Sequence, residues 1–321
     1  MAIVSDTVNT PDRSAAMLAP EEIAQLRQKY YNATVSYLRK PHEELMILRV
    51  RPDFPIPPYQ PGQYTTLGLG FWEPRVPEAQ PEELTDDQRR KVVRRAYSIS
   101  SSIWRDGELL RPEDENELEF YIVLVKRANG KPPALTPRLF CLQEGDRLIC
   151  GPKITGHYTL EGVRPDDRVL FLATGTGEAP HNRMILELIR NGHRGPIGAA
   201  VCVRYRRDLA YLDVHRRLEQ YHPRYRYITL TTRDPDVRQK KYIQDILRSG
   251  ELEERLGWSL DPACTHVFLC GNPAMIGPPK KGESGSWVFP QPTGAVELLV
   301  QRGFKIHHPK DPGNIHFEAY W

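Results

Sequence analysis

Two glycine-containing turns follow apolar segments in the second half of the chain. ATGTGEAP (173–180) follows RVLFL and opens a segment with helical periodicity, and CGNPAMI (270–276) follows the strand-like HVFL. Glycines permit close approach of the backbone to a ligand, and amides at a helix N-terminus favour an anion such as phosphate. The first turn has the pattern GxGxxP, not the full fingerprint GxGxxG. A plain strand-to-helix turn and a buried cysteine before a loop therefore remain alternatives.

Basic side chains stand where two further apolar segments end. Arg204 follows AAVCV, and Arg233 follows ITLTT. If these segments are parallel strands, their carboxyl ends lie on the same edge as the GTG turn. Two guanidinium groups there could bind a phosphate bidentately. Lys240, Lys241 and Tyr242 follow closely and could add to the pocket, although a set of solvated surface charges is the alternative.

The segment RRAYSISSS (94–102) alternates charge, phenol and hydroxyl groups. In a strand Tyr97 and Ser98 point to opposite sides. Tyr97 could stack on the face of a planar ring while Ser98 hydrogen-bonds its edge. Arg95 shares the face of Tyr97 and could reach a phosphate on the same ligand. An ordinary amphipathic strand is the alternative interpretation.

The last residues, IHFEAYW (315–321), place two aromatic side chains at the end of the sequence. Tyr320 and Trp321 favour a covered position over a solvated tail. They could stack on a flat cofactor, with Glu318 near the reacting atoms. Docking of a last strand at the edge of a sheet is the alternative.

The elements that must position these residues fall into two parts. After a polar tail, PEEIAQLRQKY (20–30) predicts a short helix. Among the strand-like segments from 33 to about 160, LTPRLFCLQEG (135–145) is the one helical candidate. The stretch 73–91 predicts an exposed loop with a helix at TDDQRRKV. Short β-branched and aromatic segments separated by turn signals predict an antiparallel barrel or sandwich. These segments are VSYL, ELMILRV, QYTTLGL, AYSIS, ELEFYIVLV and RLICG.

After residue 165 apolar strands alternate with amphipathic helices, which predicts a doubly wound parallel α/β sheet. The first of these helices places Met184, Ile185, Leu188 and Ile189 on one face. We therefore expect a tail and short helix at 1–30, a β-barrel domain at 31–160 and an α/β domain at 161–321.

Composition excludes several classes of function. The 321 residues carry a formal net charge of +3, without the basic excess of a nucleic-acid-binding protein. The five cysteines form no CxxC pair, which argues against an iron–sulfur or zinc site and predicts no metal. No apolar run is long enough to span a membrane and no signal peptide is evident, so we expect a cytoplasmic protein, most simply a monomer.

Taken together, the motifs resemble the bacterial-type ferredoxin–NADP reductase family, whose members carry FAD. RAYS (95–98) is similar to the flavin motif RxYS/T, and GTG-x-AP (175–180), CGNPAM (270–275) and the final E-x-Y-W (318–321) occur in the family's order and spacing. The other similar segments are QPGQYTTLGL (60–69), LTPRL…EGD (135–146) and VRYRRDLAYL (203–212). The resemblance covers about residues 30–321.

The resemblance implies residues that bind FAD and residues that act in catalysis. It places Tyr97 and Tyr320 on the two flavin faces and Ser98 near flavin N5. It places Arg95, Leu135 and Thr136 at the FAD pyrophosphate and Trp321 near the adenosine, and it includes Ala96 in the FAD site. The implied catalytic set, where nicotinamide C4 meets flavin N5, is Tyr97, Ser98, Cys270 and Glu318.

For NADP(H), the resemblance implies pyrophosphate contacts, 2′-phosphate ligands and further coenzyme-binding residues. The pyrophosphate contacts are Thr176 and Gly177, and the 2′-phosphate ligands are Arg204 and Arg233. The further coenzyme-binding residues are Lys241, Tyr242, Gly271 and Met275. The sequence departs from the family in five places. The N-terminal tail and the 73–91 loop are longer than in compact bacterial members. Tyr242 stands where many members have an arginine, His181-Asn182 replaces apolar residues after GTG-x-AP, and 278–292 is atypical.

The implied function is electron exchange between NADP(H) and a one-electron carrier, ferredoxin or flavodoxin, through FAD. Because these carriers are acidic, Arg89, Arg90, Lys91 and Arg94 could form a docking patch, or a solvated charge run. The main alternative is an NAD(P)H-dependent flavin reductase serving an oxygenase or a cytochrome. A non-catalytic interaction protein that lost the flavin is a second alternative.

Overall fold

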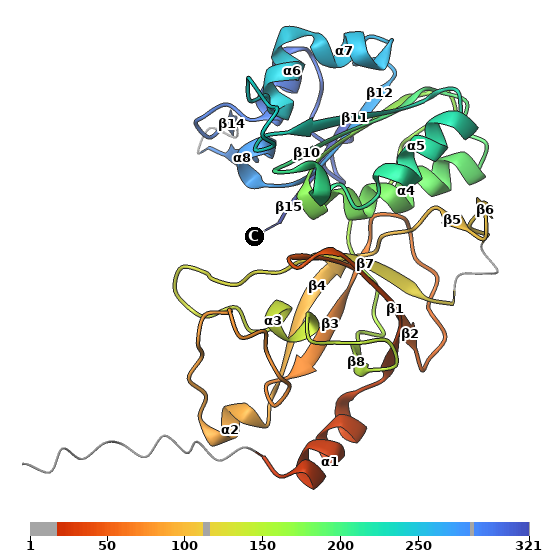
Figure 1. Ribbon diagram of the computed structural model, residues 1–321. Coiled ribbons are helices and arrows are strands. Elements are labelled where there is room, and N and C mark those ends of the chain that lie inside the picture. The colour runs from red at the N-terminus through yellow and green to blue at the C-terminus, as the bar shows by residue number, and fades with distance from the viewer. Residues whose placement is uncertain (1–17, 112–115, 283–285, 321) are drawn as a thin grey trace, which may run out of the picture.

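The computed structural model describes residues 18–111, 116–282 and 286–320, and in this part of the chain two sheets form two halves (Figure 1). The first half holds an antiparallel six-stranded sheet and the second a parallel five-stranded sheet. This confirms the expected fold class, a β-barrel followed by a doubly wound α/β sheet. The expected boundaries after residues 30 and 160 stay predictions.

The antiparallel sheet is a barrel whose two edge strands meet. Its strand order is β4-β3-β8-β1-β2-β7. A bridge between Ser100, just after β4, and Glu119 of β7 joins the edges, with Ser100 N donating to Glu119 O over 2.8 Å. The strands are β1 (Ala33–His42), β2 (Leu45–Pro52), β3 (Tyr64–Gly70), β4 (Val92–Ser98), β7 (Leu118–Val123) and β8 (Arg147–Cys150).

Short helices flank the barrel. The helix expected at 20–30 is confirmed as α1 (Pro20–Tyr30), and α2 (Asp86–Arg89) begins at a capping box formed by Thr85 and Gln88. The length predicted for the helix over 135–145 was wrong, because the observed helix α3 spans only Thr136–Leu139. The backbone after it forms i to i+3 bonds, such as Leu142 N to Leu139 O, and so tightens into turns.

The stretch 73–91 is less exposed than expected because it packs against α3. Arg138 of α3 is almost fully buried, pairs with Glu82 of this stretch and lies over the ring of Phe71, 5.0 Å from its centroid. Val76 N also donates to Pro137 O over 3.1 Å. The guanidinium group of Arg138 therefore holds the loop to the barrel.

The parallel sheet has the strand order β11-β10-β9-β12-β15, so the order reverses at β9. Its strands are β9 (Arg168–Thr174), β10 (Ile197–Val203), β11 (Tyr225–Thr231), β12 (Thr265–Gly271) and β15 (Ile315–Ala319). In such sheets ligands bind at the carboxyl ends of the strands beside the reversal. The GTG turn follows β9 and CGNP ends β12, so both expected ligand turns lie at that place.

Helices cover both faces of the parallel sheet (Figure 1). One face carries α4 (Glu178–Arg190) and α5 (Leu212–Tyr221), and the predicted apolar face of α4 is buried. The other face carries α6 (Ile243–Ser249), α7 (Glu251–Leu256), α8 (Pro273–Ile276) and α9 (Ala295–Gln301). Gly250, with φ +82°, separates α6 from α7.

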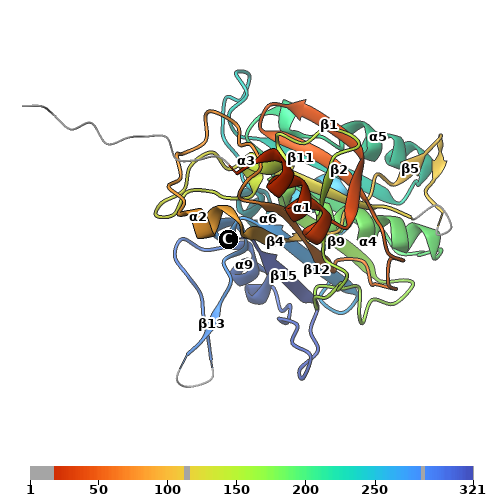
Figure 2. The same ribbon diagram turned by 90° about the horizontal axis from the view of Figure 1, so that it is seen from below.

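Two small hairpins were not expected from the sequence. One pairs β5 (Trp104–Arg105) with β6 (Glu108–Leu109). The other pairs β13 (Lys280–Lys281) with β14 (Trp287–Val288) inside the atypical segment 278–292, and it projects from the body of the molecule (Figure 2).

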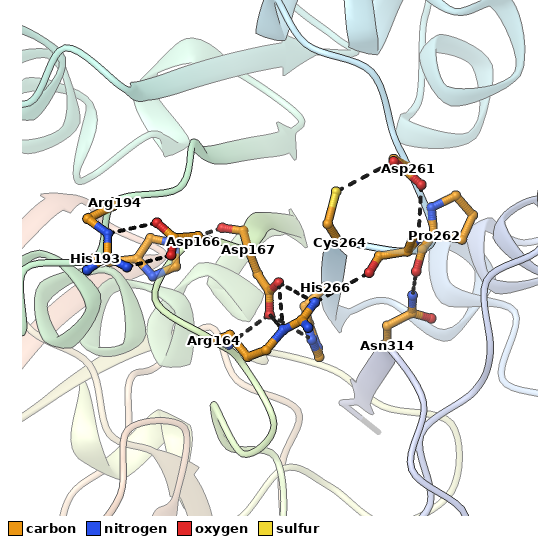
Figure 3. A network of polar contacts seen from close by, with 11 residues as sticks. Arg164, Asp166, Asp167, His193, Arg194, Asp261, Pro262, Cys264, His266 and Asn314 are labelled. Carbon is orange, nitrogen blue, oxygen red and sulfur yellow. Dashed lines mark hydrogen bonds and ion pairs between the residues drawn. The ribbon is translucent and has the colours of Figure 1, made fainter.

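A polar network anchors the segment before β9 at the amino ends of the parallel strands (Figure 3). Asp167 accepts from the backbone and guanidinium of Arg164, its carbonyl contacts His193 Nε2 at 2.8 Å, and its carboxylate lies 3.6 Å from His266. Cys264 lies here, 3.6 Å from Asp261. This edge is opposite the ligand turns, so the network supports the fold rather than the site.

Within the described ranges, no helix is long and apolar enough to cross a bilayer. The same residues contain no cluster of three or more histidine, cysteine or acidic side chains suited to a metal ion.

Candidate functional site

The turns after β9 and β12 touch each other. A Cβ atom on Gly177 would collide with the backbone carbonyl of Cys270, and one on Gly271 would collide with Thr174. The Thr174 hydroxyl also accepts from Asn272 N over 2.7 Å. Glycine is therefore required at both positions, because the two backbones pack without room for a side chain.

Four of the predicted residues converge beside these turns, and they come from both halves. In the β12–β15 register Cys270 lies opposite Glu318, and Ser98 at the end of β4 donates to Glu318 over 3.2 Å. The Tyr320 hydroxyl is in hydrogen-bonding contact with both Ser98 and Cys270. The structure thus assembles Ser98, Cys270 and the neighbouring Glu318 and Tyr320 from three distant parts of the sequence.

Burial controls the ionisation of this cluster. Desolvation raises the pKa of the Glu318 carboxyl, although the hydrogen bond from Ser98 opposes the shift. Desolvation also raises the pKa of the Cys270 thiol well above its usual range, with the nearby Glu318 adding to the effect. Cys270 is therefore a neutral thiol at physiological pH, whereas Glu318 binds a proton more readily than an exposed carboxylate.

The other residues of the RAYS motif line the outer part of β4. Arg95 and Ala96 are exposed, and the Arg95 guanidinium bonds to the Arg94 carbonyl. The Tyr97 ring packs edge-on against Phe120, 6.4 Å between centroids, and burial raises the pKa of its hydroxyl. Tyr97 is thus fixed from behind by the barrel core.

Thr176 and Gly177 lie at the start of α4, a 13-residue helix. The N-cap residue of this helix is Gly177, which has no side chain to cap it. Gly175 has a φ of +53°, and a Cβ atom added to it would meet no other atom within 4 Å. The partly exposed Gly175, just before α4, therefore leaves room for a ligand anion.

Arg204 and Arg233 are adjacent, as expected from their strand ends. Arg233 N donates to the Arg204 carbonyl over 2.7 Å, and Arg233 is exposed without an ion pair among the described residues. Arg204 lies 3.6 Å from Glu44 and 3.8 Å from Asp208. The backbones of the two residues thus meet where β10 and β11 end.

Several predicted coenzyme residues have other contacts. Lys241 pairs with Glu251 at 2.5 Å, and Tyr242 is exposed at the start of α6. The Met275 side chain is buried in the hydrophobic core under α6 and α9. Leu135 is buried, and the Thr136 hydroxyl bonds to the backbone of Val125. Trp321 lies outside the described residues.

The comparisons with known proteins agree with this arrangement. The family model for the oxidoreductase NAD-binding domain matches residues 171–280. The flavodoxin/ferredoxin–NADP reductase of Escherichia coli strain K12 is 32% identical over 225 residues, which are 69% of this chain and 77% of that protein. The chain belongs to the flavodoxin/ferredoxin–NADP reductase family.

Other members of the flavodoxin/ferredoxin–NADP reductase family match a larger share of the chain. The reductase of Buchnera aphidicola subsp. Schizaphis graminum is 28% identical over 296 residues, which are 91% of this chain and 99% of that protein. A ferredoxin NADP+ reductase from Neisseria gonorrhoeae, solved with bound FAD and NADP, has a TM-score of 0.66 at 20% identity. It covers 91% of this chain and 99% of its own, so the fold extends over nearly the whole molecule.

The basic residues expected to form a docking patch lie before and in β4, and most of them form ion pairs with acidic side chains. Arg90 bonds to Glu22 at 2.6 Å, Lys91 pairs with Asp87, and Arg89 lies 4.0 Å from Asp86. Among the described residues, Arg94 alone of the four has no ion pair. A carrier that docks here would meet less free positive charge than the sequence suggests.

Sequence reasoning missed a set of buried polar residues between the halves. Glu178, His215 and Tyr211 are almost fully buried and hydrogen-bonded there. The departure at His181-Asn182 was the available signal, because polar residues at an apolar position of a helix need partners.

Proposed function

We propose that this member of the flavodoxin/ferredoxin–NADP reductase family is an FAD-containing oxidoreductase. It exchanges electrons between NADP(H) and a one-electron carrier, ferredoxin or flavodoxin. The observation that carries the proposal is the meeting of Ser98, from the barrel, with Glu318, Cys270 and Tyr320, from the parallel sheet. A site made from both halves is suited to bring two bound cofactors together.

The residues of the barrel half fit FAD. Arg95 and Ala96 are exposed on β4, and the Tyr97 ring is held by Phe120 beside them. We assign Tyr97 and Tyr320 to the two faces of the flavin, Ser98 to its N5 edge, and Arg95 to the pyrophosphate, with Leu135 and Thr136 as further contacts. When bound, FAD accepts two electrons as a hydride and passes them on singly.

The residues of the parallel half fit NADP(H). The uncapped amide end of α4 is suited to the pyrophosphate, and the adjacent Arg204 and Arg233 are suited to the 2′-phosphate. Gly177 and Gly271 keep the two turns in contact, so Cys270 lies directly beside the GTG turn. We assign the nicotinamide position to Cys270 and Glu318.

The side chains of the cluster position groups and hold protons. The Ser98 hydroxyl donates to Glu318 and so orients the carboxylate. Because burial raises the pKa of Glu318, this residue can hold or release a proton beside the reacting atoms. The buried Cys270 thiol stays protonated and gives a small, water-free contact surface. The hydrogen-bonded Tyr320 side chain must leave its contacts when nicotinamide stacks.

The carrier, the oligomeric state and the location extend this proposal. Ferredoxin and flavodoxin are the carriers in the names of the relatives. We propose an external carrier, a monomeric protein and a cytoplasmic location, as expected from the sequence.

An anaerobic titration of the purified protein tests the proposal. We expect a yellow protein whose visible flavin band bleaches rapidly with NADPH and slowly with NADH. Reduction by NADPH should then support electron transfer to ferredoxin or flavodoxin. A protein that reduces equally well with NADH and transfers electrons to neither carrier would instead be a reductase component of an oxygenase or cytochrome system. A protein that binds no flavin after reconstitution would contradict both.

A further inference from the structure

Buried polar side chains form a continuous hydrogen-bonded path across the contact between the two halves. Four come from the parallel half and three from the barrel half. We name them the interdomain network: Tyr225, His215, Asn182 and Tyr211, then Ser100, Glu119 and Arg49. Asn182 and His215 have no exposed surface, and Ser100 is 3% exposed. Water therefore cannot replace the partners of these groups.

The carboxylate of Glu119 sets the direction of the hydrogen bonds. Tyr211 donates its only proton to Glu119 over 2.8 Å. In the 3.2 Å contact between Ser100 and Tyr211, the serine hydroxyl must then be the donor. Arg49 Nε, 2.8 Å from the other carboxylate oxygen, balances the charge at this end.

The same reasoning continues into the parallel half. Since its proton is used, the Ser100 oxygen accepts from Asn182 Nδ2 over 3.3 Å. The Asn182 amide oxygen then accepts from His215 Nε2 over 3.0 Å. His215 Nδ1 is left to accept from the Tyr225 hydroxyl at 2.8 Å. From Tyr225 to Glu119 each group donates to the next one, whereas Arg49 donates to Glu119 from the opposite end.

A branch joins the network to the ligand turn. Glu178 follows the GTG turn directly and is 2% exposed. Its Oε1 accepts from Tyr227 over 2.6 Å and lies 3.1 Å from His215 Nε2. At the other side, Ser100 is two residues beyond Ser98 of the candidate site. The network therefore links the strand that carries Ser98 to the helix that begins at the GTG turn.

We propose that Ser100, Asn182 and His215 are positioning residues that fix the GTG turn relative to β4. This inference rests on the proposed function, because the distance so fixed is the one between the flavin and nicotinamide positions. Directional hydrogen bonds suit this task, since a slip of one half along the other leaves buried groups without partners. An apolar contact would tolerate such a slip with little loss.

Asn182→Leu tests the proposal because it restores an apolar residue and deprives both Ser100 and His215 of a partner. We expect flavin reduction at saturating NADPH to slow at least tenfold, with the KM for NADPH within twofold of the native value. Displacements of about 1 Å at a transfer site have effects of this size or more. In the same FAD-loaded protein, amide hydrogen exchange at residues 100–102 and 178–182 should accelerate at least tenfold.

Two further variants keep the test decisive. His193→Leu removes another buried hydrogen bond of the same half, at the opposite edge of the sheet, and should lower stability but leave flavin reduction within twofold. Ser100→Ala is a milder change that should slow flavin reduction at least threefold. It replaces Asn182→Leu as the test variant if Asn182→Leu does not fold. The double variant should be no slower than Asn182→Leu alone, because both break one path.

Native-rate reduction in Asn182→Leu, or equal slowing in His193→Leu, would overturn the positioning role. Failure of the proposed function is a separate result, since the native protein would then bind no FAD or resist NADPH. In that case amide hydrogen exchange in Asn182→Leu still tests whether the interdomain network couples the two halves. Unchanged exchange at residues 100–102 in Asn182→Leu would show that the halves are not coupled through it.

Discussion

At the scale of single residues, the pairing of each charge decides which side chains are available to a ligand. Arg233 is exposed and has no ion pair among the described residues, whereas Lys241, close to it in the sequence, is held by Glu251. A free guanidinium can form bidentate bonds to a phosphate at no cost of a broken ion pair. The two residues therefore form a matched pair for testing coenzyme choice.

We expect Arg233→Ala combined with Arg204→Ala to raise the KM for NADPH by roughly 100-fold or more. Hydrogen bonds between charged groups contribute about 1.5–3 kcal/mol each, and NADH lacks the phosphate that would lose them. Steady-state kinetics with both coenzymes measures the effect. Lys241→Ala is the control and should change neither KM more than about threefold. Equal losses for NADPH and NADH would contradict the 2′-phosphate assignment.

Tyr320 is expected to compete with nicotinamide for the same place. Its hydroxyl bonds to Ser98 and Cys270, so a stacking ligand must displace it. We therefore predict that Tyr320→Ser tightens nicotinamide binding and raises turnover with NADH by roughly tenfold. Binding of NADP+ followed by difference absorbance, together with NADH kinetics, provides the measurement. Unchanged affinity and unchanged NADH turnover would show that Tyr320 does not occupy that place.

At the scale of elements, the meeting of the turns after β9 and β12 depends on missing side chains. Gly177 has an ordinary φ of −60°, so its requirement is steric and comes from the Cys270 carbonyl. At Gly192, past the end of α4, glycine is favoured by the backbone conformation and not by lack of space. Its φ is +69°, and a Cβ there would meet nothing within 4 Å.

These two glycines separate an effect on the site from an effect on stability. Gly177→Ala should force the turns apart, slow flavin reduction at least tenfold and lower stability by about 1–3 kcal/mol. Gly192→Ala should lower stability by about 1–2 kcal/mol through backbone strain alone. Stopped-flow reduction and urea unfolding measure the two effects. A normal reduction rate in Gly177→Ala would mean that the contact between the turns is dispensable.

The elements also show what the sequence can and cannot predict. Strand ends and glycine turns are local signals, so Arg204, Gly177 and Cys270 were correctly placed at one edge of the parallel sheet. The predicted length of α3 was wrong because the backbone there depends on contacts between residues that are distant in the sequence. These contacts are the burial of Arg138 and the packing against the 73–91 stretch. The network around His215 was missed for the same reason, since its partners are distant in sequence. The approach of Ser98 to Glu318 was predicted only through the family resemblance.

At the scale of the whole molecule, buried histidines link folding to pH. Desolvation lowers the pKa of His181 to about 3 and that of His316 to about 3. Both are therefore neutral when folded but titrate near 6.5 when unfolded. The unfolded state then binds more protons below pH 6.5, so stability is full above that pH and is lost as the pH falls. Glu318 acts in the opposite sense, because its pKa is raised.

We expect each of these two histidines to remove about 1.4 kcal/mol of stability between pH 7.5 and pH 5.5. His316 stacks on Phe268 with 4.4 Å between ring centroids, so phenylalanine should fit its place. Denaturant unfolding of His316→Phe at the two pH values should show a loss smaller by about 1.4 kcal/mol than in the native protein. The exposed His157 is the control, and His157→Phe should leave the loss unchanged. A native-like loss in His316→Phe would contradict the assigned burial effect.

The one-way order of the hydrogen bonds through Ser100, Asn182 and His215 also bears on how such a contact can arise in evolution. Each of these side chains needs the others, because replacing any one leaves buried donors or acceptors unpaired at about 1–3 kcal/mol apiece. A lineage passing from an apolar contact to this polar one, or back, must cross intermediates that are less stable than either end. Substitutions at the three positions should therefore be inherited together, and reversal at one position alone should be selected against.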